Sequence, residues 1–365
     1  MSNGDYLEVD FLDVQSKDSG DAIPIRIRKD GIVSIHVVDG GFQDTGQHVV
    51  SHIRKHYDDS GYIDRVVVTH PDGDHARGLR TVLEDLDVGE LWMLRPWLYA
   101  DELLPRFKNF SNVENLKNRL REVYENIAAL EDIAETERIT IREPFQGAEI
   151  GRFTVLAPKK KRYLDLVVHS ERTPEADEEP KEIMEAGIGG FFHKAASAVA
   201  NLVKAEWGVE VFSDEETSAE NDMSVVQYAE VCGKRILLTG DSGRTALHEA
   251  ADYAAAIGIQ LPGIERFQVP HHGSRRNISS EVLNRWLGEK RADKPDPGSE
   301  TCTAIVSVAK EDDDHPRNAV VRACIHRGAK VISTEDGSVL IGFNAPNRDN
   351  WGPIDPLPYP EDQEE

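Results

Sequence analysis

The stretch VVVTHPDGDHARGL, residues 66–79, holds four side chains that can bind a metal ion within six positions. These side chains are His70, Asp72, Asp74 and His75, and they follow an apolar run that is typical of a buried β-strand. Pro, Asp and Gly are common in turns for backbone reasons alone, but a turn does not require two histidines. Because neutral imidazole and carboxylate suit zinc and other divalent ions, the stretch predicts a metal site at the end of a strand.

Two later strands are predicted to end in side chains of the same kind. The segment RILLTGDSG, 235–243, places Asp241 after an apolar run, and RFQVPHHGS, 266–274, places His271 and His272 there. In an α/β sheet, ligands bind outside the carboxyl ends of the strands. We therefore expect both segments to meet the first stretch in a single crevice.

Strand and helix patterns alternate through both halves of the chain. Strands are predicted at 6–14, 23–29, 32–41, 64–70, 224–231, 234–241, 266–272 and 303–309, and the segment 330–343 closes the pattern. Helices are predicted at 47–57, near 244–257, near 278–287 and near 317–327. This alternating order is typical of an α/β fold.

Two segments interrupt the alternation. Between about 100 and 137, apolar residues recur at steps of three and four, which predicts one long amphipathic helix. We expect this helix to pack on the core, with self-association as the alternative. The segment from about 160 to 220 is charged and contains a helical pattern at 194–207, which we interpret as a partly flexible insertion. Residues 351–365 are rich in Pro and acidic side chains, so we expect an extended strap or a frayed end.

The composition limits the classes of partner. The 365 residues include 42 basic and 66 acidic side chains, which gives a formal charge of −24. This charge opposes non-specific attraction to nucleic acid or anionic lipid, so a polyanionic substrate would need a local positive site. Neither a secretion signal nor an apolar stretch of membrane-spanning length is visible, and we expect a cytoplasmic protein that makes no membrane contact. The three cysteines lack paired spacing and indicate neither disulfides nor a thiolate metal site.

The segments THPDGDH, LLTGD and VPHHGS occur in an order that resembles the metallo-β-lactamase superfamily, specifically the hydrolase domain of the DNA-uptake protein ComEC and its stand-alone relatives. FLDV with SGDAIPI, VVDGG, ENDMS and SVAKEDDDHP support the resemblance more weakly. The resemblance implies a hydrolase domain over 1–350, with insertions at about 100–137 and 160–220, followed by the tail at 351–365. It also implies an αββα sandwich, in which two mixed β-sheets are flanked by helices and the metal site lies at one edge between the sheets.

The resemblance further implies two divalent metal ions, Zn2+ or Mn2+. His70 and Asp72 would hold one ion, and Asp74 and His75 would hold the other. Asp241 would bridge the two ions. The resemblance therefore draws the ligands from strand ends that lie far apart in the sequence.

The remaining ligands are less well defined. One of His271 and His272 would complete a site, and His271 is favoured because it comes first after the strand. Asp72 stands where many members of the superfamily have histidine, which makes that site richer in oxygen and makes manganese credible beside zinc. Many members also supply a histidine between the first motif and the bridging aspartate. Here His169 and His193 lie in the variable insertion and fit that role poorly.

The implied chemistry is hydrolysis of a phosphodiester. Two metal ions that share a hydroxide provide the nucleophile and stabilise the charge that develops on a phosphoryl oxygen. The predicted function is therefore a dinuclear metal-dependent phosphodiesterase, with a DNA nuclease as the first choice. Asp74 would also orient the hydroxide, and His315 in SVAKEDDDHP would protonate the leaving oxygen as a general acid. The alternative for His315 is an ordinary histidine of a surface loop.

Four further residues are candidates for substrate binding. Arg275 and Arg276 follow HHGS directly, where two guanidinium groups could clamp a phosphate, although a solvated basic pair is the alternative. Asn221 and Ser224 belong to ENDMS and are expected to order the pocket by hydrogen bonds. In VVDGG, Asp39 is interpreted as part of a turn rather than as a ligand.

Other functions remain open at this point. The same metal chemistry would serve a small-molecule phosphodiesterase or an enzyme that hydrolyses a lactone or a lactam. A regulatory or scaffold component of a multiprotein system is the alternative from another class, with a protein partner on the helical insertion at about 100–137.

Overall fold

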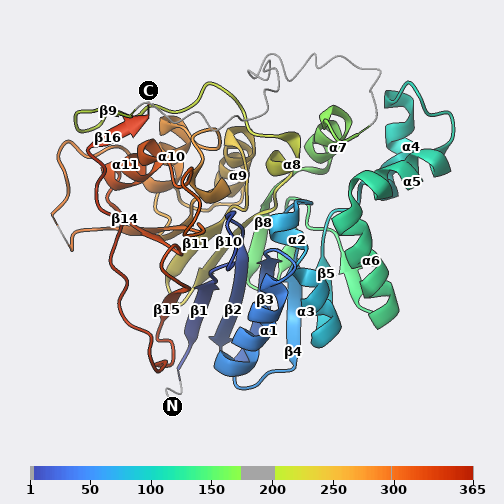
Figure 1. Ribbon diagram of the computed structural model, residues 1–365, viewed down its shortest axis with the longest axis horizontal. Helices are drawn as coiled ribbons and strands as arrows, with labels where there is room; N and C mark the ends of the chain where they lie inside the picture. The colour runs from blue at the N-terminus through green and yellow to red at the C-terminus, as the bar shows by residue number, and fades with distance from the viewer. Residues whose placement is uncertain (1–3, 174–201, 297, 365) are drawn as a thin grey trace.

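In the computed structural model, which describes residues 4–173, 202–296 and 298–364, two large β-sheets pack face to face (Figure 1). The first sheet has the strand order β15-β1-β2-β3-β4-β5-β6. Its strands are β1 (Tyr6–Phe11), β2 (Ala22–Lys29), β3 (Ile32–Gly40), β4 (Tyr62–Val67), β5 (Asp87–Trp92), β6 (Thr140–Arg142) and β15 (Val339–Phe343). Neighbouring strands are antiparallel from β15 to β3 and parallel from β3 to β6, so the sheet is mixed.

The second sheet has the order β14-β13-β12-β11-β10-β8-β7. Its strands are β7 (Glu149–Ile150), β8 (Phe153–Ala157), β10 (Val226–Val231), β11 (Lys234–Leu238), β12 (Arg266–Gln268), β13 (Cys302–Val306) and β14 (Ala329–Ser333). It is antiparallel from β7 to β11 and parallel from β11 to β14. A short additional sheet pairs β9 (Leu202–Lys204) with β16 (Asp362–Glu364).

One apolar cluster fills the space between the two large sheets. Val9 and Ile25 of the first sheet belong to the same cluster as Phe153, Ile236 and Ile305 of the second. Every residue of β1 is buried, as expected for a strand that is covered on both faces. Burial of these side chains supplies the main stabilisation of the sandwich.

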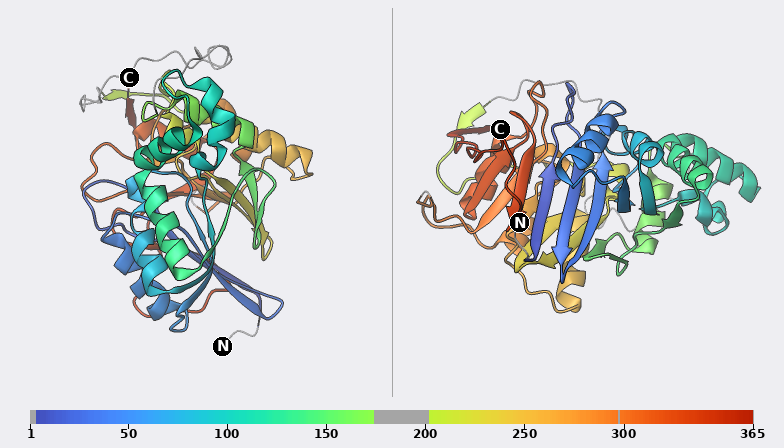
Figure 2. Two further views of the ribbon diagram at one scale, coloured as in Figure 1. Left: turned by 90° about the vertical axis from the view of Figure 1, so that its right-hand side faces the viewer. Right: turned by 90° about the horizontal axis from the view of Figure 1, so that it is seen from below.

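Helices cover the outer face of each sheet, and a side view shows them on both sides of the strands (Figure 2). On the first sheet these are α1 (Thr45–His56), α3 (Leu79–Asp85), α5 (Val113–Val123), α6 (Glu125–Glu137) and α7 (Lys160–His169). On the second sheet they are α9 (Arg244–Ala256), α10 (Ser280–Leu287) and α11 (Asn318–His326). Shorter helical segments are α2 (Gly73–Ala76), η1 (Pro96–Tyr99), α4 (Ala100–Leu103), η2 (Leu104–Arg106), α8 (Ala219–Asp222) and η4 (His271–Gly273). The predicted αββα sandwich is confirmed.

The predicted single helix at about 100–137 is wrong, because the segment folds as α4, α5 and α6. The chain leaves the helical conformation at Tyr124, where φ is −106° and ψ is 48°. The break lets α5 and α6 each turn an apolar face to the core, and Leu120 of α5 and Leu130 of α6 are both fully buried. The expectation that this segment packs on the core is confirmed.

The charged segment at about 160–220 also differs from the prediction. Its start forms α7, and the side chains of Tyr163 and Val167 belong to the apolar cluster under the helices of the first sheet. The helical pattern at 194–207 lies partly outside the described residues, and where it is described, Leu202–Lys204 form the strand β9. The helix prediction is wrong for these three residues, since they pair with β16 instead.

The chain end is an extended strap. Glu364 accepts hydrogen bonds from the backbone N–H groups of Asn318 and Ala319, at 2.9 and 3.0 Å, and so caps the first turn of α11. The guanidinium of Arg322 binds the carbonyl oxygen of Pro360 at 2.6 Å. Of the two expected forms, strap and frayed end, the described residues adopt the strap.

The topology brings several strand ends to one edge of the sandwich. β3 and β4 are parallel neighbours in the first sheet, and β11, β12 and β13 are parallel neighbours in the second. The loops meet closely, since a Cβ at Gly78 would lie 1.9 Å from the carbonyl oxygen of Gly40, so only glycine fits. Within the described residues, no helix combines the length and apolar character that crossing a membrane requires.

Candidate metal centre

Side chains from four segments converge at this edge. His70 follows β4, Asp74 and His75 lie in α2, Asp241 follows β11 and His272 lies in η4. The Nε2 atom of His75 is 3.3 Å from Oδ1 of Asp241, and Nε2 of His70 is 3.9 Å from Oδ2 of the same carboxylate. The Nε2 atom of His272 is 3.7 Å from Oδ2 of Asp74. Residues 70–75 and the strand ends of the second sheet therefore share one site.

These separations suit atoms that bind a common cation. Bonds of about 2.0–2.2 Å to zinc place tetrahedral ligand atoms roughly 3.3–3.6 Å apart. The groups Asp74–His75–His272 and Asp21–His75–Asp241 each offer three ligand atoms within 4.8 Å of one another. Most of the separations are too long for good hydrogen bonds but close to the spacing of atoms around one ion.

The buried polar atoms of the site point to the same conclusion. In the described part of the chain, the Nε2 atoms of His70, His75 and His272 and the Oδ1 atom of Asp241 are buried without a hydrogen-bond partner. An unpaired buried polar atom costs about 1–3 kcal/mol, so several of them in one place require a cause. Divalent cations would satisfy all four atoms, and the residues present therefore fit such ions.

The other ring nitrogen of His70 and of His75 is anchored to Asp39. Nδ1 of His75 donates to Oδ2 of Asp39 at 2.8 Å. Nδ1 of His70 lies 3.0 Å from Oγ1 of Thr69, which donates to Asp39 Oδ2 at 2.6 Å. These bonds fix the tautomer that leaves the Nε2 lone pair free for a metal ion. Asp39 also belongs to a candidate metal group, but its 2.8 Å contact with His75 is a hydrogen bond, and we assign it as an anchor.

The second sheet anchors its ligands in the same way. Nδ1 of His272 lies 2.8 Å from the carbonyl oxygen of Ser307, which follows β13. The backbone N–H of Asp241 donates to Oγ of Ser224 at 3.0 Å, and Nδ2 of Asn277 donates to the carbonyl oxygen of Asp241 at 2.8 Å. Both the orientation of the ring and the position of the carboxylate are thereby fixed before any ion binds.

The electrostatics of the site favour a positive charge. Burial alone would lower the pKa of His75, but the carboxylates of Asp241 and Asp74 outweigh burial and raise this pKa well above its usual range. The same balance raises the pKa of His272 to about 9. A divalent cation can supply this charge in place of protons, so metal binding and protonation should compete.

The backbone at the site is strained. Asp39, His271 and His272 have φ values of 56°, 47° and 53°, in the left-handed region that non-glycine residues adopt at a cost. Strain of this kind is concentrated at functional sites, where surrounding contacts hold it in place.

Two predicted ligands occupy the margin of the site. Oδ2 of Asp72 is 3.8 Å from Nε2 of His70, on the side of the predicted first ion. Nδ1 of His271 is 3.1 Å from Oδ2 of Asp241 and contacts the amide of Asn221. The geometry favours His272 over His271 as the ligand, because His272 belongs to a three-residue group and its Nε2 atom is buried without a hydrogen-bond partner. The choice between the two histidines stays a prediction.

The predicted general acid lies beside the ligands. The ring of His315 is 6.0 Å from that of His271 and 6.3 Å from that of His272, measured between centroids. Its Nδ1 atom is 3.2 Å from Oδ2 of Asp312, and this oxygen also accepts a 2.6 Å hydrogen bond from Oγ of Ser19. The carboxylate thus holds the ring with its Nε2 atom available.

The predicted arginine clamp is less well placed. The guanidinium of Arg276 forms an ion pair with Glu215, and both side chains are exposed. The carbonyl oxygen of Arg275 accepts a hydrogen bond from the backbone N–H of Ser213 at 3.3 Å. These contacts join η4 to the segment before α8, and the role of both arginines in substrate binding stays a prediction.

The sequence did not reveal all residues of the site. Asp39 is predicted to be part of a turn, but it lies near the end of β3, which is parallel to β4, and this position is the signal that could have placed it. Asp21 is buried, accepts a 2.9 Å hydrogen bond from Nε2 of Gln268 and lies in a candidate metal group with His75. It belongs to SGDAIPI, a segment that supports the resemblance to the superfamily but gave no ligand prediction.

The two histidines of the variable insertion lie elsewhere. His169 bonds to the carbonyl oxygen of Asp165 at 2.7 Å within α7, and His193 lies outside the described residues.

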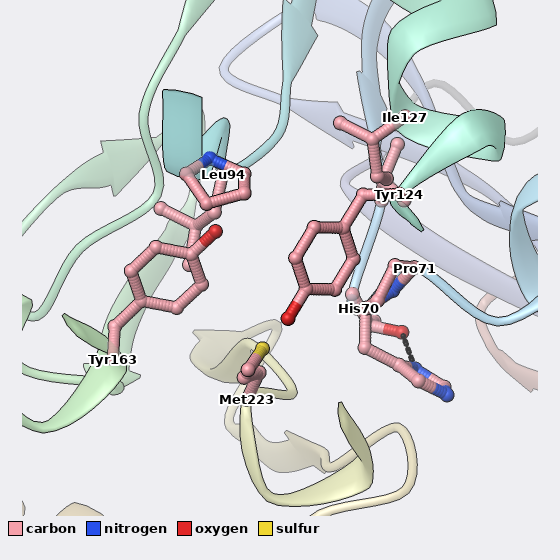
Figure 3. Close-up of a pocket in the computed structure, with 10 residues that line it drawn as sticks. His70, Pro71, Leu94, Tyr124, Ile127, Tyr163 and Met223 are labelled. Carbon is pink, nitrogen blue, oxygen red and sulfur yellow. Dashed lines mark hydrogen bonds between the residues drawn. The ribbon is translucent and has the colours of Figure 1, made fainter. Parts of the chain in front are cut away.

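A narrow pocket lies next to His70, between the sheet and the helical insertion. Figure 3 shows its lining, with Tyr124 and Tyr163 on facing walls and Met223 at one end. The free space of about 20 Å³ accommodates about one water molecule. Tyr124, the residue that separates α5 from α6, therefore lines this pocket together with the predicted ligand His70.

Comparisons with known proteins give only distant matches. No protein-family model matches the chain, and no curated protein is significantly similar to it. Among solved structures, the hydrolase AbOPH of the beta-lactamase superfamily is 11% identical over 66% of this chain and 72% of its own, with a TM-score of 0.31. A beta-lactamase domain protein from Burkholderia ambifaria is 13% identical over 74% of this chain and 70% of its own, with a TM-score of 0.33. The metallo-beta-lactamase SMB-1, bound to 2-mercaptoethanesulfonate, is 11% identical over 68% of this chain and 74% of its own, with a TM-score of 0.26.

Proposed function

We propose that this chain is a ComEC-like metal-dependent hydrolase of the metallo-β-lactamase superfamily that cleaves phosphodiester bonds, with DNA as the first substrate to test. One observation carries this proposal: the partnerless Nε2 atoms of three histidines converge on the carboxylates of Asp74 and Asp241 at the carboxyl ends of both sheets. Such a ligand set suits two divalent cations, Zn2+ or Mn2+.

Each residue has a distinct role in this proposal. His70 and Asp72 would hold one cation, and Asp74, His75 and His272 would hold the other, in keeping with the atoms that face one another in each group. Asp241 would serve both, because its two oxygens face His75 and His70 separately. The cations would supply an activated water and neutralise charge that develops on a phosphoryl oxygen.

The net charge of the chain and the packing of α5 and α6 bear on the alternative functions. The formal charge of −24 leaves a small phosphodiester as the second candidate, because such a substrate needs less positive surface than DNA. A scaffold role through the helical insertion is disfavoured, since the apolar faces of α5 and α6 are already buried in the core. A lactone or lactam substrate would use the same ligands and is included in the test.

Hydrolysis and metal content test the proposal together. Purified protein loaded with zinc or manganese is expected to cleave bis-p-nitrophenyl phosphate or single-stranded DNA and to contain nearly two metal equivalents. Asp241→Asn should lose at least one equivalent and most of the activity, whereas Asp101→Asn, a change at an exposed residue of α4, should alter neither. Wild-type protein that retains metal but cleaves neither phosphodiester, or that turns over nitrocefin faster, would refute the phosphodiesterase assignment.

The role of His315 has its own test. If its Nε2 atom protonates the leaving oxygen, His315→Gln should slow cleavage of DNA about 100-fold or more, because an alkoxide leaves poorly without a proton. Cleavage of bis-p-nitrophenyl phosphate should change far less, since p-nitrophenolate leaves without protonation. Equal losses on both substrates would show that His315 is not the general acid.

A further inference from the structure

The segment after α7 brings a guanidinium to the metal centre. Nη2 of Arg172 is 2.7 Å from Oδ1 of Asp72. The other oxygen of the same carboxylate, Oδ2, faces Nε2 of His70 at 3.8 Å. Asp72 can therefore ligate a cation through one oxygen while Arg172 holds the other.

Neighbouring residues hold the backbone of Arg172, while its side chain stays partly exposed. The backbone N–H of Arg172 donates to Oγ of Ser170 at 3.1 Å, and Ser170 donates to the carboxylate of Glu220. The Nε atom of Arg172 is 3.8 Å from Oε1 of Glu220, whose side chain is 6% exposed. The Arg172 side chain is 43% exposed, so part of it is accessible beside the two carboxylates.

We propose that Arg172 is a substrate-binding residue that donates from its open side to a non-bridging oxygen of the phosphodiester while it orients Asp72. This inference rests on the proposed function, because it names the group that recognises the phosphate. A guanidinium presents several N–H donors in one plane, so it can hold a carboxylate and a phosphoryl oxygen together. It would supply the local positive charge that a chain of net charge −24 needs for an anionic substrate.

The ion pair of Arg172 makes it a better candidate than Arg276, which follows HHGS. Arg172 pairs directly with a proposed metal ligand. The ion pair of Arg276 is formed with Glu215, which is itself 59% exposed and is not a proposed ligand. Arg172 thus lies next to the position where a phosphoryl oxygen would meet the cations.

Binding of inorganic phosphate to metal-loaded full-length protein tests the inference without turnover. Isothermal titration calorimetry on Arg172→Ala should show phosphate affinity reduced at least about tenfold, the scale of a charge-assisted hydrogen bond. Arg172→Lys should lose part of the affinity, because it keeps the charge but not the planar donors. Arg152→Ala removes a half-exposed arginine elsewhere and should bind as the wild type does. Arg276→Ala tests the rival position, and a larger loss there than in Arg172→Ala would overturn the inference.

Metal content separates the two roles of Arg172. Unchanged phosphate affinity in Arg172→Ala would overturn the inference, and so would wild-type protein that binds no phosphate. If Arg172→Ala loses metal, Arg172→Lys is the deciding variant. An Arg172→Lys protein that retains metal but binds phosphate more weakly supports the inference. An Arg172→Lys protein that retains metal and binds phosphate with full affinity, or that also loses metal, overturns it. Phosphate binding that depends on Arg172 in a protein that cleaves no phosphodiester would refute the proposed function but leave the anion site standing.

Discussion

At the scale of single residues, Asp39 connects the ligands to the sheet. It ends a strand in a left-handed conformation with φ of 56°, and it accepts hydrogen bonds from Thr69 and His75. Because Thr69 in turn contacts His70, one carboxylate orients two of the proposed ligands. Under the proposed function, Asp39 would orient the proposed ligand atoms towards a cation.

Replacing Asp39 should therefore weaken metal binding. Asp39→Asn keeps the size of the side chain, but its amide nitrogen donates and does not accept, so in either orientation it faces an N–H or O–H group that now donates to Asp39. We expect zinc affinity, measured by competition with a chelating dye, to fall about 10- to 100-fold, as is typical when the anchor of a histidine ligand is lost. The exposed variant Asp101→Asn serves as the control. Equal affinities of Asp39→Asn and wild type would mean that Asp39 is an ordinary turn residue, as the sequence suggested.

Single residues also show which parts of the candidate site could not be predicted from the sequence. The cluster at 70–75 was predictable because an ordinary turn does not require four ligand-type side chains in six positions. The choice between His271 and His272 was not, since both have left-handed φ values and their side-chain directions depend on the loop as a whole. Arg172 gave no signal, because its contact with Asp72 spans 100 residues of chain and depends on where α7 ends.

At the scale of elements, the order of strands and helices could be predicted from the sequence, but the breaks within helices could not. The apolar period of 100–137 continues across Tyr124, because α5 and α6 both turn an apolar face to the same core. A pattern that reports burial cannot distinguish one long helix from two that share a core. The strand β9 could not be predicted for another reason: it forms by pairing with β16, which lies far away in the sequence.

The same insertion supports the loop at residues 70–75, which carries several of the proposed ligands. Nδ2 of Asn126, in α6, donates to the carbonyl oxygen of Pro71 at 3.1 Å, and its Oδ1 atom accepts from Arg80 of α3 at 3.1 Å. Pro71 lies between the proposed ligands His70 and Asp72. The insertion therefore contacts the loop of the candidate site as well as covering the sheet.

At the scale of the whole molecule, buried charges tie distant parts of the chain together. Glu210, in the segment after β9, accepts from Nδ1 of His326 and Nη1 of Arg327, both at 2.8 Å, and from the hydroxyl of Ser280. Its side chain is 1% exposed. This carboxylate joins the segment that precedes α8 to α10 and α11, and the strap formed by the chain end packs beside it through Tyr359, whose hydroxyl contacts His326.

This cluster predicts a loss of stability in acid. Burial opposes the charge of Glu210, but the hydrogen bonds from His326, Arg327 and Ser280 outweigh burial and lower the pKa from 4.5 to about 2. Because the folded pKa is the lower one, the charged form stabilises the fold above about pH 4.5, and this contribution is lost as the pH falls towards 2. At about 1.4 kcal/mol for each pKa unit, the pH-dependent contribution is about 3.5 kcal/mol.

Urea unfolding of wild type and Glu210→Gln, both with a metal chelator present so that the metal ligands do not contribute, measures this contribution. We expect the difference in the free energy of unfolding to shrink by about 2 kcal/mol between about pH 7 and about pH 3, because the wild type loses its charged carboxylate and the glutamine does not titrate. Glu206→Gln, at an exposed position in the same segment, serves as the control variant. A constant difference for Glu210→Gln would mean that hydrogen bonds independent of charge hold the segment to α10 and α11, and that the acid sensitivity of the protein arises elsewhere.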